Sequence, residues 1–170
     1  MDYSTPQYFM CLANTPKCPS GYTYVKSFGM QTSCLRCTGN PHQVISGGTS
    51  AWDIRDFNVV NKICAGEGTR PIIPQSSADY SIISNFVKNF DAASVGTNVW
   101  LGVRTRLGGF VSFANDRILK STSATGYQNP TGGKYCNVMS IGTAPTVGIH
   151  NCQERNSSSA VYGLCEHTEC

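Results

Sequence analysis

Residues 135–165, with the sequence YCNVMSIGTAPTVGIHNCQERNSSSAVYGLC, decide the fold of this chain. The stretch holds three short β-prone runs, at 135–141, 146–150 and 160–165, separated by residues typical of turns. Cys136 belongs to the first run, Cys152 goes with the second, and Cys165 closes the third. This pattern predicts an antiparallel sheet that is fastened by disulfide bonds.

The chain is rich in cysteine and poor in charge. It has nine cysteines among 170 residues, and only 14% of its residues are charged. A cysteine content this high is typical of disulfide-bonded proteins from an oxidising compartment. We therefore expect a secreted, extracellular protein. Because nine is odd, at least one sulfur cannot pair within the chain. Cys170, the final residue, is our candidate for a free thiol or for the link of a disulfide-bonded homodimer.

The segment before the sheet predicts two helices. Ser50 and Asp53 form a capping-box pattern, after which Phe57, Val60 and Cys64 recur at helical spacing, and the run ends at the glycines 66 and 68. A second capping box at residues 76–79 opens a helix whose expected buried stripe consists of Ile83, Phe86, Val87 and Phe90.

Short strands surround these helices. Residues 71–74 read as an apolar strand that its prolines confine to an edge, and residues 99–103 and 110–113 read as further strands. Trp100 is expected in the core because it lies in an apolar strand. Two helices followed by a small antiparallel sheet predict a single α+β domain.

The first 50 residues are irregular apart from a hairpin expected around residues 21–25. They carry Cys11, Cys18, Cys34 and Cys37, which allow two local bridges in three pairings. The spacing of Cys34 and Cys37 also suits a zinc knuckle or a redox pair. A second such pair and a suitable histidine are missing, so disulfides are the favoured interpretation.

Composition excludes several classes of protein. The net charge is only +3 and the basic residues are scattered, so we expect no nucleic-acid partner. No stretch is long and apolar enough to span a bilayer. The first residues lack the layout of a signal peptide, so a secreted form would have lost its leader. Asn156-Ser157-Ser158 is an acceptable N-glycosylation sequon, which predicts a glycoprotein.

Read together, these segments resemble the C-type lectin-like domain, and among its members they are most similar to those of nematodes. The resemblance covers residues 18–166 and leaves residues 1–17 as an amino-terminal extension, 18–167 as the domain and 168–170 as a short tail. It rests on the following segments: Cys18-Pro19-Ser20-Gly21-Tyr22, Trp52 with the helix to Cys64, residues 67–73, Trp100-Leu101-Gly102-Val103, Phe113-Ala114-Asn115-Asp116, Cys136, Cys152 and Leu164-Cys165-Glu166.

The resemblance implies a set of disulfides. Cys64 would bond to Cys165 and tie the first helix to the last strand, and Cys136 would bond to Cys152. Cys18 would pair with Cys34 or Cys37, and Cys11 would take the remaining partner.

The calcium-dependent sugar site of that family is not expected here. The Glu-Pro-Asn type of tripeptide is absent, and the nearest sequence is Tyr127-Gln128-Asn129-Pro130. Residues 147–149 stand where the family has Trp-Asn-Asp, and they offer no side-chain oxygen. Calcium needs six to eight oxygen ligands, several of them anionic, and no carboxylate lies between Asp116 and Glu154. We therefore predict no metal and no cofactor.

Five residues are candidates for binding a ligand without metal. Asn129, Lys134, Tyr135, His150 and Asn151 offer amide, ammonium and aromatic groups that suit a sugar or a protein surface. The alternative interpretation is that Asn129 and Asn151 terminate turns while Tyr135 packs on the sheet.

The leading functional hypothesis is recognition of a glycan or glycoprotein, as the resemblance implies. The alternative is a protein-binding or structural extracellular module. Neither the three histidines nor any Ser, Cys or paired-acid pattern has the spacing of a catalytic site, so we expect no enzyme activity.

Overall fold

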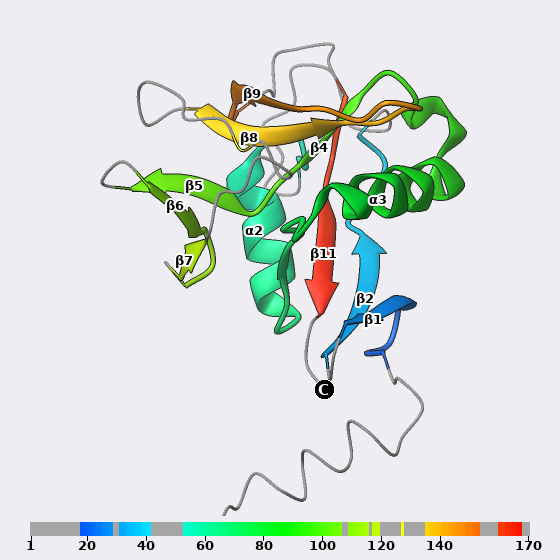
Figure 1. Cartoon of the computed structure of the whole chain (residues 1–170), viewed down its shortest axis with the longest axis horizontal. Coiled ribbons are helices and arrows are strands. Elements are labelled where there is room, and N and C mark those ends of the chain that lie inside the picture. The colour runs from blue at the N-terminus through cyan, green and yellow to red at the C-terminus, as the bar shows by residue number, and fades with distance from the viewer. Residues whose placement is uncertain are drawn as a thin grey trace, which may run out of the picture.

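The computed structural model describes residues 18–28, 31–41, 53–106, 109–115, 117–119, 127, 135–153 and 160–167. These residues form an α+β arrangement of two α-helices, a 3-10 turn and eleven short strands (Figure 1). The helices are α2 (Phe57–Gly66) and α3 (Ser77–Phe90), and the turn is η2 (Ala92–Ser94). The strands are β1 (Thr23–Phe28), β2 (Gln31–Cys37), β3 (Arg70–Pro71), β4 (Asn98–Trp100), β5 (Val103–Arg106), β6 (Gly109–Ser112), β7 (Ile118–Leu119), β8 (Tyr135–Ser140), β9 (Val147–Asn151), β10 (Val161–Tyr162) and β11 (Leu164–His167).

The described strands form three small sheets, and the predicted antiparallel pairing holds for all but one strand pair. Their orders are β1-β2-β11-β3, β10-β4-β8-β9 and β5-β6-β7. All described pairs are antiparallel except β10 with β4, which run parallel. The last run of the chain is divided between two sheets, because β10 joins β4 and β11 joins β2 and β3.

Gly163 makes this change of sheet possible. It lies between β10 and β11, where the chain passes very close to Thr38 and Val60. A Cβ at this position would lie 2.2 Å from Thr38 Oγ1 and 2.7 Å from Val60 Cγ2. Only glycine fits such an approach without moving its neighbours.

Helix α2 begins later than the sequence pattern predicts. The side chain of Asp56 accepts a hydrogen bond from the Asn58 amide at 2.9 Å and caps the helix. Asp53 is engaged elsewhere, because its carboxylate accepts hydrogen bonds from the Arg55 guanidinium at 2.9 and 3.0 Å. The capping box predicted from Ser50 and Asp53 is therefore wrong, and the helix starts at Phe57.

Helix α3 occupies the predicted residues but buries a narrower stripe. Ile83 and Val87 are buried, whereas Phe90 is 48% exposed. Phe90 and Phe86 line an open groove beside β2, so the last turn of the helix does not close against the strand. The prediction that Phe90 is buried is wrong for this reason. Neither described helix has the length and apolarity needed to cross a membrane.

Two clusters of buried side chains form the core. One contains Leu35, Ile83, Val99 and Met139, and the other contains Phe57, Val60, Trp100 and Val138. Trp100 is fully buried as predicted, and its indole Nε1 donates a hydrogen bond to the Ile54 carbonyl at 2.9 Å.

Three disulfides tie the elements together, and they join pairs that the resemblance implied. Cys64 in α2 bonds to Cys165 in β11 across 101 residues of sequence. Cys136 and Cys152 connect β8 to the residue that follows β9, and Cys18 bonds to Cys34. Each closed loop restricts the unfolded chain and so stabilises the folded one.

Cys37 corrects the expected disulfide set. It is a free, buried thiol, so it is not the partner predicted for Cys11. The reason lies in the strand geometry: Cys34 and Cys37 are three positions apart in β2 and face opposite sides of the sheet. Cys34 therefore joins the core cluster around Trp100, and Cys37 joins the one around Leu35. Cys11, Cys170 and the sequon at Asn156 lie outside the described residues, as do the predicted extension and tail.

Candidate functional site

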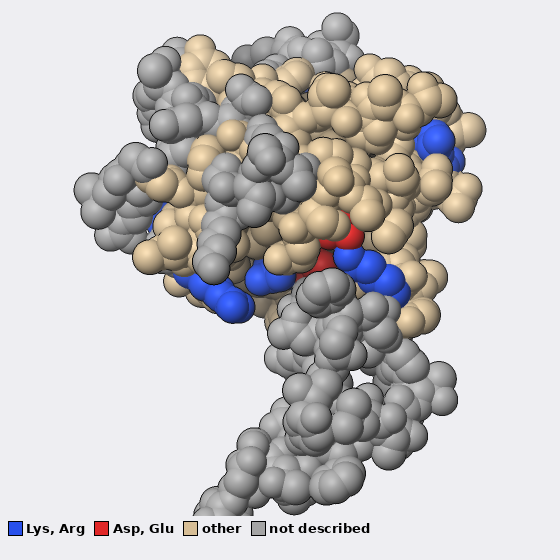
Figure 2. All heavy atoms as spheres, viewed as in Figure 1, with Lys and Arg blue, Asp and Glu red and all other residues tan. Residues whose placement is uncertain are grey.

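The described surface carries few charges. On the face in Figure 2, most atoms are neither acidic nor basic, and the charged side chains gather mainly along the lower edge of the described part. Acidic and basic atoms adjoin one another there. Two kinds of region are therefore worth comparing as functional sites: the clustered charges and the uncharged surfaces.

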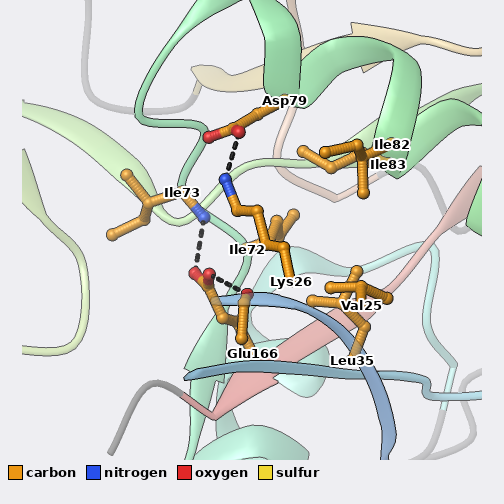
Figure 3. A pocket seen from close by; sticks show the side chains of 10 residues that line it. Val25, Lys26, Leu35, Ile72, Ile73, Asp79, Ile82, Ile83 and Glu166 are labelled. Carbon is orange, nitrogen blue, oxygen red and sulfur yellow. Dashed lines mark hydrogen bonds and ion pairs between the residues drawn. The ribbon is translucent and has the colours of Figure 1, made fainter. Parts of the chain in front are cut away.

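The most concentrated chemistry is a group that we call the charged cluster: Lys26, Ser33, Arg70, Asp79 and Glu166. The Lys26 ammonium forms an ion pair with one carboxylate oxygen of Asp79 (Figure 3). The other oxygen of Asp79 accepts a hydrogen bond from the backbone amide of Gln75 at 2.7 Å. Glu166 accepts hydrogen bonds from the Ser33 hydroxyl at 2.8 Å and from the Ile73 amide at 3.5 Å (Figure 3). Arg70 completes the group at 3.6 Å from Glu166.

Burial dominates the electrostatics of Glu166. The residue is only 5% exposed, and desolvation raises the pKa of its carboxyl above the ordinary value. The charge of Arg70 and the hydrogen bonds from Ser33 and Ile73 act in the opposite direction and do not cancel that effect. A buried carboxyl with a raised pKa can be a general acid or base, provided that a substrate reaches it.

The cavity beside these groups is too small for a substrate. Its volume is about 10 Å³, which is about the space of one water molecule. Much of its wall is aliphatic, from Val25, Leu35, Ile72 and Ile83. The members of the cluster come from the hairpin, β3, α3 and β11, so their pairing fastens four elements together. We interpret the charged cluster as a structural group that stabilises the packing of these elements.

A second polar group fastens the hairpin to the end of α2. Arg36 in β2 forms an ion pair with Glu67, and the Tyr22 hydroxyl donates to the same carboxylate at 2.7 Å. Burial opposes ionisation of Glu67, but the hydrogen bonds from Arg36 and Tyr22 prevail and lower its pKa. Both partners are partly exposed, so this pair contributes little to stability.

A groove of about 420 Å³ lies between β2 and the last turns of α3, and no sequence pattern predicted it. Its lining includes Arg36, Cys37, Phe86 and Phe90. The Arg36 guanidinium is engaged with Glu67. Burial raises the pKa of the Cys37 thiol to about 12, in spite of the nearby Arg36 charge, so the sulfur is not a nucleophile at neutral pH. The groove offers shape without reactive chemistry.

The sheet face at the β8–β9 pair has the opposite character. Tyr135 stands directly opposite Asn151 in the antiparallel register, and Ile149 follows on the same face of β9. Tyr135 is 37% exposed, Ile149 is 42% exposed and Asn151 is exposed. We call these three residues the Tyr135 surface. It combines a ring, an aliphatic side chain and an amide, with no charge among them.

Of the five ligand residues that the sequence predicts, the structure describes Tyr135, His150 and Asn151. Tyr135 and Asn151 come together. His150 points to the other face of β9 and is half-buried. Its Nε2 accepts a hydrogen bond from the side-chain amide of Asn98 at 3.3 Å. Asn151 is the last residue of β9, and its Oδ1 accepts a hydrogen bond from the backbone amide of Gln153 at 3.0 Å. This is a turn role of the kind that the alternative interpretation gives to Asn151. Asn129 and Lys134 lie outside the described residues.

Ile149 is the residue of this surface that sequence reasoning missed. Its position two residues before Asn151 in a strand already placed it on the same face as Asn151. The exposure of an isoleucine, however, depends on what packs over the strand, and that is not visible in the sequence. Among the described residues, no three His, Cys, Asp or Glu side chains converge as metal ligands would.

Comparison with known proteins finds matches among solved structures. No family model matches the chain, and no curated protein matches it. A solved structure described as the EPNH mutant of CEL-I aligns with 89% of this chain and 97% of that chain, with 12% sequence identity and a TM-score of 0.49. A likeness of this degree carries no argument about function.

These findings correct the family prediction. The short motifs from Cys18 to Glu166 resemble the C-type lectin-like domain one by one, but no family model recognises them together, and the match to CEL-I is too weak to assign a family. The assignment is therefore withdrawn. What stands is a disulfide-bonded α+β domain with two helices and three small sheets.

Proposed function

We propose that this chain is a secreted binding module that recognises a protein ligand through the Tyr135 surface, without catalysis and without bound calcium. The observation that carries the proposal is the exposure of Tyr135 and Ile149 next to each other on an uncharged sheet face. Tyrosine is enriched in protein interfaces and in the small set of residues that dominate binding energy, whereas charged residues are depleted from interface centres.

The disulfides support an extracellular location. Three cystines join the described elements, and such bonds form and persist in oxidising compartments. The expected covalent dimer through Cys170 belongs to the same proposal and would present two Tyr135 surfaces at once.

The geometry of the charged cluster supports a role without catalysis. Its carboxylates line a cavity that has room for about one water molecule, and their oxygens accept hydrogen bonds from the protein itself. The charged side chains of the cluster thus hold β1, β3, α3 and β11 together.

A glycan is the second candidate ligand. Tyr135 and Asn151 stand directly opposite each other, so a sugar could stack on the ring and bond to the amide. The exposed Ile149 beside them favours the protein ligand, because an aliphatic side chain offers a sugar hydroxyl no partner.

The test is affinity capture from the extracellular fluid of the source, with the full chain immobilised. Three forms are compared: the unmodified chain, Tyr135→Ala and the matched control Tyr24→Ala. Tyr24 is also an exposed strand tyrosine, at 44%, but it belongs to β1. We expect the same protein to be captured by the unmodified chain and by the Tyr24 variant, and to be lost with the Tyr135 variant.

Two additional arms decide among the alternatives. A glycan array read with and without EDTA should give no signal if the ligand is a protein; an EDTA-insensitive signal that disappears in Tyr135→Ala would establish the glycan instead. Capture that is lost in Phe90→Ala and kept in Tyr135→Ala would place binding in the groove beside α3 and contradict the proposal.

A further inference from the structure

The edges of the three sheets differ in how they are protected. Exposed strand edges tend to pair with other strands, and proteins prevent this with charges, prolines, bulges or very short strands. β1 has Lys26 and an irregular register between Tyr24 and Lys26, and β5 has Arg104. β3, β7 and β10 each have only two residues.

Strand β9 has none of these protections. It has five residues, Val147 to Asn151, without a charge or a proline. Its register with β8 is continuous from Tyr135–Asn151 to Met139–Val147, so no bulge bends it. It is the outermost strand of the order β10-β4-β8-β9, and no described strand pairs with its outer side.

The hydrogen bonds of the β8–β9 pair show which groups point outward. The Ser140 amide donates to the Thr146 carbonyl at 2.8 Å, so these two residues form a hydrogen-bonded pair. In an antiparallel pair such positions alternate, so Gly148 and His150 bond inward to β8. The backbone amides and carbonyls of Val147, Ile149 and Asn151 therefore point to the open edge. Consistent with this, the Asn137 carbonyl opposite Ile149 accepts a hydrogen bond from the backbone amide of Leu101, the residue that follows β4.

We propose that the open edge of β9 pairs antiparallel with β9 of a second copy of this chain. The three outward-pointing residues are centred on Ile149, so a two-fold axis at Ile149 aligns all of them. Ile149 then pairs with its counterpart, and each Val147 lies opposite the other copy's Asn151. The result is one continuous sheet of eight strands.

A second copy fits this edge better than an arbitrary peptide for two reasons. The strand is uncharged, so two copies bring no like charges together. The side chains also agree, because antiparallel pairing places Ile149 of both copies on the same face and buries two exposed aliphatic groups against each other. Ile149 belongs both to the dimer contact and to the Tyr135 surface, but the test of the dimer does not use the proposed ligand.

The test is the mass of the full-length Cys170→Ser chain by sedimentation equilibrium, with its internal disulfides intact. That background removes any covalent dimer through Cys170. We expect the average mass to rise from the 18.3 kDa monomer toward twice that value as concentration increases from about 1 µM to about 1 mM.

Two substitutions at one position separate backbone pairing from side-chain association. Ile149→Pro removes an amide that points outward, so it costs the fold no β8–β9 hydrogen bond. It should weaken the dimer about tenfold relative to Ile149→Ala, because two intermolecular backbone hydrogen bonds are lost. Near-ultraviolet circular dichroism checks that both variants are folded.

A monomer mass at every concentration would overturn the inference, as would a proline variant that dimerises like the alanine variant. Either result leaves the proposed function intact if the monomer still captures its ligand. Loss of capture in Tyr135→Ala with dimerisation unchanged is expected, since Tyr135 lies on β8 and not at the open edge.

Discussion

The charged cluster and the Tyr135 surface are opposites in composition and in use. The cluster contains an ammonium, a guanidinium and two carboxylates, and it is closed around a cavity of about 10 Å³. The Tyr135 surface has no charge and is open to solvent. In the proposed function, the charged side chains stabilise the fold and uncharged side chains contact the other molecule.

This difference follows from the cost of burying charge. A buried carboxylate without partners is expensive, so Asp79 and Glu166 persist only because β1, β2, β3 and the segment between β3 and α3 supply partners to them. Removing one partner exposes that cost. The residues of the Tyr135 surface carry no charge, so substituting one of them leaves no buried charge without a partner.

The largest effect is expected from Asp79→Ala. The substitution leaves the Lys26 ammonium and the Gln75 amide without their acceptor. We expect the free energy of unfolding to fall by about 2–3 kcal/mol, which allows for the partial solvent access of Lys26. Urea unfolding monitored by tryptophan fluorescence measures it, since Trp100 is buried in the native state.

Two variants sharpen this result. The double substitution Lys26→Met with Asp79→Leu should cost less than Asp79→Ala alone, because it leaves no unpaired charge. Tyr135→Ala should change the unfolding free energy by less than about 0.5 kcal/mol. The contrast between the two regions breaks down if Tyr135→Ala destabilises the protein as much as Asp79→Ala does.

A smaller effect is expected in the pH dependence of stability. Burial raises the pKa of Glu166 in the folded state above the unfolded value of about 4.3. The stability that this residue contributes is therefore fully present below about pH 4.3 and is lost as pH rises through the folded-state pKa. Glu166→Gln removes the titration, so the variant should gain stability relative to the unmodified chain between about pH 4 and about pH 7.

The measurement is urea unfolding of both chains at several pH values in that interval. Arg70, Lys26 and Asp79 remain in both chains, so their own pH effects largely cancel in the difference. A stability difference that stays constant with pH, or that shifts in favour of the unmodified chain as pH rises, would contradict the raised pKa.

Much of the secondary structure could be predicted from local patterns. Helix α3 forms where predicted because its apolar residues keep helical spacing, although the Ser76 side chain makes no capping hydrogen bond. The runs at 135–141 and 146–150 became β8 and β9 because alternation and turn residues are local signals. The predicted start of α2 was wrong because either of two aspartates could cap the helix. The Asp53 carboxylate binds the Arg55 guanidinium, so Asp56 is the cap.

Tertiary features were out of reach for a different reason. The charged cluster unites Lys26 with Asp79 and Ser33 with Glu166, which is 133 residues away in sequence. Nothing local distinguishes these residues from solvated charges. The parallel β10–β4 pair and the exposure of Ile149 likewise depend on how segments meet in space. Of the predicted ligand residues, Tyr135 and Asn151 came together because the hairpin register pairs them.

The central claim is that recognition belongs to the Tyr135 surface and structure to the charged cluster. The most direct test is the Kd of the captured protein ligand for Tyr135→Ala and Glu166→Gln, measured side by side by calorimetry. The account predicts binding weakened about tenfold or more by Tyr135→Ala and changed by less than about twofold by Glu166→Gln. The reverse pattern, with affinity lost in Glu166→Gln and kept in Tyr135→Ala, would contradict it.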